Sequence, residues 1–460
     1  CWLAWLPQHW PLALPVWCVR PIVKRDSKAG YYCPMKIARS LLILAVSTPL
    51  ALAPAVAGAT GIGQTCKKVG LVAVVKVSGK ATKVQCIKVG KNLKWQQVSS
   101  SSKTDSSVTA ASALAPTENC RIADITPGVI SSGFPRPDGY PSTLKKLRVL
   151  VLPVSFTDLP FTASDLNYVK SKYKDANSYY VATSYGAASF ETVYADSANW
   201  ANAGGSLSEN GLTNSNLQFD RSSFFRRLIG EYEAKSSTAG YDIVEIVTSS
   251  SGQFGGATGM PPGSSMYGTG RSFGGILSTG GAAFSWNTLA HELGHAWLAL
   301  EDLYFFQTDG QISAGYPVIG AWDLMGISSG NQKELGGWNR WLAGWIASTS
   351  IRCVEKGATT RHLLEPLSTK QTSAGSKMMV YKLSDHSVVI AEYRAESAYN
   401  EAQSKLLVYR VDTSFGHGQG PVRYIADLGK AGTSVIVDSV KISLQKIDKA
   451  GVLIEVSSAG

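Results

Sequence analysis

The stretch AHELGHAWLALEDLYFF, residues 290–306, decides how this sequence is interpreted. Residues four apart on an α-helix share a face, with about 5–6 Å between their Cβ atoms, so His291 and His295 can direct two imidazoles at one ion. Zinc accepts neutral imidazole nitrogens and keeps a coordination position open for water. Glu292 follows the first histidine, where its carboxylate can take a proton from an activated water. The spacing therefore predicts a metal-binding helix.

An inert pair of histidines is the competing interpretation. The chain has only six histidines, so two at this spacing with a glutamate between them are not expected by chance. The flanking segments FSWNTLA and AWLAL are apolar and predict a buried helix, in which an unpaired histidine pair would be costly. The metal-binding interpretation is therefore favoured.

The third protein ligand is open between two carboxylates. Glu301 and Asp302 follow His295 by six and seven residues. On a straight helix, which rises about 1.5 Å per residue, either would lie roughly 9–10 Å along the axis from His295. The chain must therefore turn back after residues 298–299 for one of them to bind. Glu334, on a later predicted helix, is a third alternative.

The run resembles the metzincin signature, in which HExxH is followed by xxGxx and a His or Asp. It is more similar to the immune inhibitor A-like family of secreted zinc metallopeptidases, whose helix is followed by an Asp and an aromatic residue, as in EDLY. GAWDLMG (320–326) matches the family's turn, whose methionine lies beneath the metal and would be Met325. GGWNRWLAGWI (336–346) resembles its Trp-rich helix, and residues 388–412 its following strand pair. The resemblance covers about residues 120–457.

This resemblance implies a secreted zinc endopeptidase that hydrolyses peptide bonds of protein or peptide substrates with metal-activated water. His291 and His295 would bind Zn²⁺, and Glu292 would be the general base and acid. Aligning the shared DLY makes Asp302 the third ligand, whereas counting from the second histidine makes it Glu301. We favour Asp302, because a one-residue insertion is accommodated more easily in a turn than in the shared DLY motif that follows it.

The sequence departs from the family at this turn, because Leu298 or Ala299 stands where the family has glycine. The departure keeps two other functions open. One is a surface-binding or adhesion protein with a vestigial peptidase domain, although such a domain would be expected to lose Glu292. The other is a zinc amidase that acts on a cell-wall polymer. Outside the resemblance, Met325 would be interpreted as core filling, and Asp323 as a turn-former or as a partner that orients a histidine.

The resemblance and the remaining patterns together imply an α+β fold. The resemblance implies a metzincin-like zinc peptidase domain, and the patterns predict a β-sandwich after it and a small disulfide-stapled β module before it. Residues 147–156 and 241–250 have the β-branched content of strands, and 162–176 begin with a Thr/Ser cap and continue at helical spacing. After about residue 350, short alternating runs such as SVVIAEYR indicate a β-sandwich. The predicted regions are an upstream non-native extension (1–34), a signal peptide (35–57), a Lys-rich β module (58–98), a Ser/Thr-rich linker (99–117), the peptidase domain (118–350) and the sandwich (351–460).

The signal peptide is predicted from MKIARSLLILAVSTPLALAPAVAGA, which begins at Met35. A short basic region precedes an apolar run over residues 41–52, and small residues at 55–57 form a cleavage signal. The run is short for a membrane span, although an N-terminal anchor is the alternative. We therefore expect a secreted protein that is not stably inserted in a membrane after cleavage. Association with the cell wall is an alternative to free secretion.

Four cysteines follow the predicted cleavage site. An even number in an exported chain favours disulfide bonds over catalytic thiols. Cys66 and Cys86 are close in the sequence and are expected to pair, which leaves Cys120 and Cys353 to join the start of the main domain to its end.

Positive charge is concentrated in the predicted module. Residues 58–98 contain eight lysines and no acidic residue, against a net charge of +11 for the whole chain; residues 1–57 contribute +5, which leaves −2 for residues 99–460. The module is therefore expected to contact an anionic cell-wall or surface polymer, unless it is simply a well-hydrated small domain. Nucleic acid is not an expected partner, since the module lacks interleaved aromatic residues.

Three weaker expectations complete the sequence analysis. The Gly-rich residues 251–283 are predicted to form a loop with one exposed strand, and residues 274–278 are candidates for holding a substrate backbone by strand addition. His362, His386 and His417 are expected at the surface of the sandwich. A structural Ca²⁺ is possible, but no motif supports one.

Overall fold

The computed structural model describes most of the chain from residue 64 to residue 459, in two compact units, residues 1–100 and 101–460. The fold is mixed α+β, with many strands and few helices. The predicted extension and signal peptide lie outside the described residues, as does most of the linker. Described are residues 64–69, 71–77, 80–89, 91–97, 114–125, 128–212, 221–250, 256–260, 262, 274–279, 285–305, 318–326, 334–372, 375–400, 404–416 and 418–459.

The first unit contains a three-stranded antiparallel sheet in the order β1-β2-β3. Its buried core comprises Val75, Val84, Cys86 and Trp95, and the predicted disulfide between Cys66 and Cys86 is confirmed. A core of this size needs such a covalent link to remain folded. The strands are β1 (Val72–Val77), β2 (Lys80–Val89) and β3 (Asn92–Gln97).

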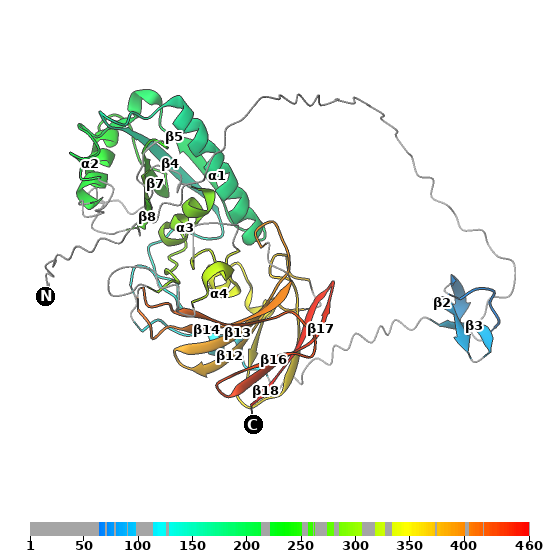
Figure 1. Cartoon of the computed structure of the whole chain (residues 1–460). Helices are drawn as coiled ribbons and strands as arrows, with labels where there is room; N and C mark the ends of the chain where they lie inside the picture. The colour runs from blue at the N-terminus through cyan, green and yellow to red at the C-terminus, as the bar shows by residue number, and fades with distance from the viewer. Residues whose placement is uncertain are drawn as a thin grey trace, which may run out of the picture. The chain divides into compact units, whose positions relative to one another are not determined.

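The second unit begins with a mostly parallel sheet in the order β5-β4-β7-β9-β8 (Figure 1). Strands β5, β4, β7 and β9 run parallel, β8 runs antiparallel at the edge beside β9, and β6 pairs with the end of β4. The strands are β4 (Lys146–Ser155), β5 (Ser189–Tyr194), β6 (Ala201–Asn202), β7 (Ile243–Val247), β8 (Gly256–Met260) and β9 (Gly274–Thr279).

The prediction for the Gly-rich stretch is wrong in one respect. Residues 274–278 belong to β9, which lies between β7 and β8 and has neighbours on both sides. The edge strand next to β9 is β8, which the Gly-rich composition concealed because Gly has a low strand propensity. On this side of the sheet, strand addition could therefore take place at β8 and not at the residues that the sequence suggested.

Helices cover both faces of this sheet. The predicted helix at 162–176 is observed and runs to Thr183; Thr162 begins it with a capping box, in which its side chain and that of Asp165 each accept a backbone N–H. Side chains of β4 alternate between a core with α1 and α3 and a second core with α2. The helices are α1 (Ala163–Thr183), α2 (Arg221–Glu233), α3 (Trp286–Ala296) and α4 (Gly337–Leu342), with 3₁₀ turns at Thr117–Cys120, Ser197–Asn199, Gly320–Trp322 and Ser348–Ser350.

Two further sheets follow residue 350 and pack face to face around a shared core. One has the order β10-β12-β13-β14-β15 and the other β11-β18-β17-β16. Their strands are β10 (Ile351–Val354), β11 (Thr360–Leu364), β12 (Met378–Ser384), β13 (Ser387–Arg394), β14 (Lys405–Asp412), β15 (Val422–Leu428), β16 (Ser434–Val437), β17 (Val440–Asp448) and β18 (Gly451–Ser458).

Strand β13, in the middle of the five-stranded sheet, is buried on both faces, and one of these faces packs against the core that contains α3. All eight residues of β13 are buried. Val388 and Ile390 belong to the same core as α1, α3 and α4, whereas Val389 and Ala391 face the second sheet of the sandwich. The predicted disulfide Cys120–Cys353 is confirmed and links residues 233 positions apart across this core.

Candidate metal centre

Helix α3 carries the two histidines and is buried along most of its length. Its start is capped by Ser285, whose side-chain oxygen accepts the N–H of Thr288 at 3.3 Å. Trp286 begins the helix and Ala296 ends it. The predicted apolar helix is thus observed, and it places His291 and His295 one turn apart in the interior.

The chain reverses after α3, as the third-ligand argument requires. Ala299 has a φ of 59°, the left-handed conformation that ends many helices. It stands at one of the two positions where the resembled family has glycine. The Leu300 N–H returns to the Gly294 carbonyl at 3.0 Å and closes the turn. An alanine in this conformation costs about 1–2 kcal/mol, so other contacts must hold the turn.

The turn brings Asp302 back onto the two imidazoles. The Nε2 atoms of His291 and His295 lie 3.2 Å apart, and Asp302 Oδ1 lies 3.0 Å from the first and 3.2 Å from the second. All three side chains are buried, and their ligand atoms lie within 4.8 Å of one another. This group could therefore bind a metal ion.

The three separations suit a small tetrahedral ion. Ligand atoms at about 2.0–2.1 Å from a tetrahedral zinc lie about 3.3 Å from one another, close to the 3.0–3.2 Å observed. Asp302 Oδ1 is buried and, in the part of the chain that the structure describes, has no hydrogen-bond partner. A cation between the three atoms would satisfy it, so these residues fit a zinc ion.

Both histidines are oriented by backbone carbonyls. His291 Nδ1 lies 3.1 Å from Leu324 O, and His295 Nδ1 lies 2.7 Å from Leu300 O. A carbonyl can only accept, so each Nδ1 carries a proton, and Nε2 is the ring atom that each histidine could offer to a metal ion. This arrangement is typical of metal-binding histidines, whose second nitrogen donates to a fixed acceptor.

The electrostatics of the group favour a positive charge. Burial alone would lower the pKa of His295, but the charges of Asp302 and Glu292 raise it to about 9. Burial likewise opposes ionisation of Asp302, yet the neighbouring histidines hold the pKa of that carboxyl well below its usual range. Surroundings that stabilise an imidazolium in this way would also stabilise a metal cation.

The two competing carboxylates point elsewhere. Glu301 is buried next to Asp302, and its Oε1 accepts the Asp302 N–H at 3.0 Å. Glu334 lies among arginines: its Oε2 is 3.1 Å from Arg394 Nη1 and 3.7 Å from Arg340 Nη2. The structure thus brings Asp302, rather than either alternative, to the histidines.

Glu292 and Tyr304 complete the surroundings of the group. Glu292 is buried beside His291 on α3. The Tyr304 ring stacks on the His291 ring, with centroids 6.3 Å apart and planes 11° apart. Burial and the charges of Asp302 and Glu292 raise the pKa of Tyr304, so its hydroxyl stays protonated at neutral pH and can donate a hydrogen bond.

Met325 lies directly against helix α3. It is fully buried, and its N–H donates to Asp323 Oδ1 at 2.8 Å while its carbonyl accepts the Leu303 N–H at 2.9 Å. A Cβ placed on Gly294 would meet Met325 Sδ at 2.6 Å. The methionine therefore occupies the space that this glycine leaves, between the two histidines along the helix.

This close contact predicts opposite effects for two glycine-to-alanine substitutions. Gly294→Ala should lower the free energy of unfolding by about 1–3 kcal/mol, because the new methyl overpacks the buried Met325. Gly230→Ala, in α2, should raise it by about 0.5–1 kcal/mol, because its Cβ would meet nothing within 4 Å. Urea denaturation of both variants checks the prediction; a stabilised Gly294→Ala would contradict the packing described.

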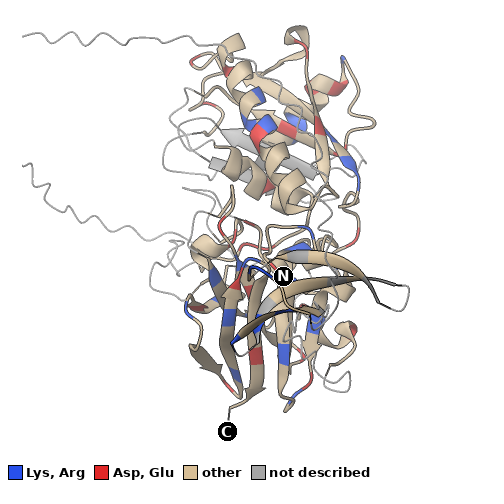
Figure 2. Ribbon diagram, turned by 90° about the vertical axis from the view of Figure 1, so that its right-hand side faces the viewer, with Lys and Arg blue, Asp and Glu red and all other residues tan. Residues whose placement is uncertain are grey.

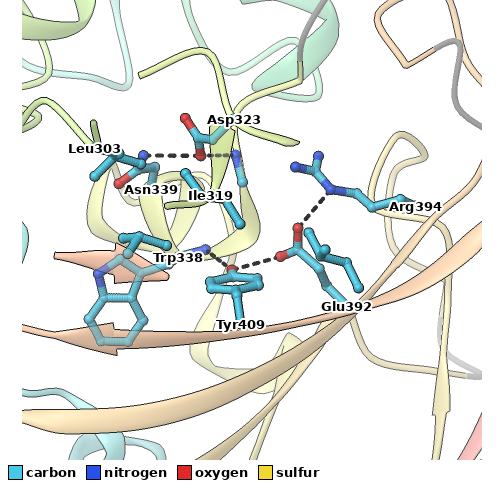
Figure 3. Close-up of a pocket in the computed structure, with 11 residues that line it drawn as sticks. Leu303, Ile319, Asp323, Trp338, Asn339, Glu392, Arg394 and Tyr409 are labelled. Carbon is cyan, nitrogen blue, oxygen red and sulfur yellow. Dashed lines mark hydrogen bonds and ion pairs between the residues drawn. The ribbon is translucent and has the colours of Figure 1, made fainter. Parts of the chain in front are cut away.

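Asp323 shapes the turn that supplies the Leu324 carbonyl. Besides the Met325 N–H, its carboxylate accepts the Gly336 N–H at 2.7 Å and the Asn339 side-chain amide at 3.2 Å (Figure 3). Of the two predicted roles, turn formation is the one observed, since both histidines bond to carbonyls. Asp323 acts on His291 only by fixing that turn.

The sandwich sheet supports the same turn through buried charges (Figure 3). Arg394, at the end of β13, donates to the Trp322 carbonyl, and its Nε lies 2.8 Å from Glu392 Oε1. Glu392 Oε2 accepts the Gly337 N–H at 2.8 Å and the Tyr409 hydroxyl at 2.9 Å. The sandwich is therefore joined to the 320–326 turn and to the start of α4 by hydrogen bonds as well as by apolar packing.

The remaining histidines differ in part from the expectation. His362 is buried, not exposed: it lies on β11, its Nε2 is 2.7 Å from Thr360 Oγ1, and burial together with Arg352 lowers its pKa to about 4. The surface assignment was wrong because the side chain alternates inward toward the sandwich core. His386 is half-buried, and His417 lies outside the described residues.

Sequence reasoning missed the groups that orient the site. Tyr304 lies in the EDLY motif but had no assigned role. Glu392 and Arg394 gave no signal, because each meets its partners only through the tertiary fold. The backbone carbonyls that orient the histidines likewise have no sequence signature.

Comparison with known proteins adds no relative: no model of a protein family matches the sequence, and no curated protein is similar to it. Within the described ranges, no helix is long and apolar enough to cross a membrane. Along the described ribbon of residues 101–460, basic and acidic residues are interspersed (Figure 2). The geometry of the site must therefore carry the functional argument.

Proposed function

We propose that the protein is a secreted zinc-dependent endopeptidase. The observation that carries the proposal is the group of three buried donor atoms, His291 Nε2, His295 Nε2 and Asp302 Oδ1, separated by 3.0–3.2 Å. Two imidazoles and one carboxylate are a common ligand set of catalytic zinc. The resemblance of residues 290–306 and 320–326 to secreted metallopeptidases supports the same conclusion, and the two disulfides support an oxidising compartment.

The catalytic proposal assigns one task to each residue. When bound, zinc would lower the pKa of a water molecule and polarise a peptide carbonyl. Glu292 takes the proton of the attacking water and passes it to the departing amine. Tyr304, protonated at neutral pH, offers a hydrogen-bond donor beside Asp302.

Metal content and casein hydrolysis of the purified full chain test this proposal together. One zinc per chain, with cleavage that a chelator stops and added zinc restores, is the expected result. Zinc without cleavage of casein but with cleavage of a cell-wall amide would favour the amidase. A chain with neither metal nor turnover would favour a surface-binding protein with a vestigial domain.

We also propose that the β1–β3 module binds an anionic cell-wall or surface polymer. Residues 58–98 contain eight lysines and no acidic residue, so the positive charge of this segment is not neutralised within it. Lys67, Lys68, Lys88 and Lys91 are exposed. Clustered exposed cations attract a polyanion through long-range charge, which salt screens.

Retention on a sulfated polysaccharide resin measures this attraction. Replacing Lys67, Lys68, Lys88 and Lys91 by Gln in the full chain should move elution to lower salt. Equal elution of this variant and a control with the same charge change would contradict the proposal. The control replaces four exposed lysines of the second unit, Lys356, Lys430, Lys441 and Lys449.

A further inference from the structure

The turn after α3 lacks the residue that makes such turns easy. Ala299 adopts a φ of 59°, a conformation that glycine enters readily and alanine does not. The hydrogen bond from Leu300 to Gly294 closes the turn from within the helix. The last carbonyls of a helix have no partners in the helix itself and must find them elsewhere.

A loop from the start of the main domain supplies these partners. Arg136 Nε donates to Leu298 O at 3.1 Å, and Arg136 Nη2 donates to Trp297 O. The Ser131 N–H donates to Ala299 O at 2.9 Å. A guanidinium suits this place, because its planar fork donates to several acceptors and its charge is favourable at a helix C-terminus.

Arg136 is itself held in place. Its Nη2 also donates to Pro141 O at 2.9 Å, and its guanidinium lies 5.2 Å from the centre of the Tyr140 ring. The loop is anchored to α4, where Trp338 Nε1 donates to Ser132 O at 2.7 Å. The Arg136 guanidinium is thus held in place, so little conformational freedom is lost when it donates to the carbonyls at the end of α3.

We infer that Arg136 is a positioning residue for the metal centre, which holds the Ala299 turn so that Asp302 returns to the histidines. The inference rests on the proposed metal site. Arg136 does not touch the ligand atoms; it acts through the carbonyls of the turn. The same turn presents Leu300 O, which orients His295 at 2.7 Å, so two of the three ligands depend on it.

Zinc affinity of the metal-free full chain, measured by competition with a chromogenic chelator, tests this role. Arg136→Gln should weaken zinc binding by about 10-fold to 100-fold, the usual loss when a group that orients a ligand is removed. Arg136→Lys should weaken zinc binding less than Arg136→Gln does. The lysine ammonium can donate to a carbonyl, but it lacks the planar set of donors that lets a guanidinium bond to several carbonyls at once. Arg148→Gln is the control, since Arg148 donates to Gly240 O at 3.1 Å rather than to the turn.

Ala299→Gly distinguishes positioning from general stabilisation. Glycine needs no clamp at this φ, so adding it to Arg136→Gln, or to Arg136→Lys if the first variant does not fold, should restore most of the affinity. Thermal unfolding without metal confirms that each variant is folded. Unchanged affinity in Arg136→Gln, or a loss that glycine does not restore, would overturn the inference. A wild-type chain that binds no zinc would overturn both the proposed metal site and the role of Arg136. Zinc binding without peptide cleavage would contradict only the proposed function.

Discussion

Asp302→Asn is expected to abolish the proposed zinc binding. The asparagine keeps the size of the side chain but loses the negative charge that lies 3.0 Å and 3.2 Å from the two imidazoles. Zinc affinity should fall by more than the roughly 10–100-fold that follows loss of a group outside the ligands, because a direct ligand is lost. Equilibrium dialysis of the full chain against buffered zinc measures the change.

Glu301→Gln is the matched control for this substitution. It removes the same charge from the adjacent buried residue, yet the Glu301 carboxylate bonds to the Asp302 N–H rather than facing the imidazoles. Its zinc affinity should stay within a fewfold of the wild type. Loss of zinc from Glu301→Gln with retention in Asp302→Asn would reverse the ligand assignment and favour strict counting from His295.

The local part of the metal site could be predicted from sequence, because its chemistry lies on one helix. The spacing of His291 and His295 places both rings on one face whatever the rest of the chain does. The choice between Glu301 and Asp302 could not be derived in this way. It depends on the φ of Ala299, which the surrounding fold imposes against the preference of alanine.

The wider support of the site was outside the reach of sequence reasoning. Arg394 and Glu392 lie in a strand whose residues are all buried, although their charge alone would assign them to the solvent-facing side of a strand. They are buried because they pair with each other and with backbone groups near the 320–326 turn. Likewise, the parallel pairing of β9 with β7 joins two segments that no local sequence pattern connects.

Glu292→Gln is expected to lower turnover by about 10²–10⁴-fold, the usual contribution of a general base, while zinc stays bound. Glutamine has the same shape, but it cannot take a proton from water. The side chain is buried and is not among the three grouped ligands, so metal stoichiometry and thermal unfolding should stay close to those of the wild type. Casein hydrolysis, zinc content and melting temperature of one preparation check all three expectations.

Glu292→Asp separates the charge of this residue from its position. The carboxylate remains but is withdrawn by one methylene, and a displacement of about 1 Å can cost 10²-fold in rate. An activity between those of the wild type and Glu292→Gln would show that both proton transfer and placement matter. Full activity in Glu292→Gln with zinc bound would remove this residue from the mechanism. The protonated hydroxyl of Tyr304 cannot replace it, because a base must accept the proton that the water loses.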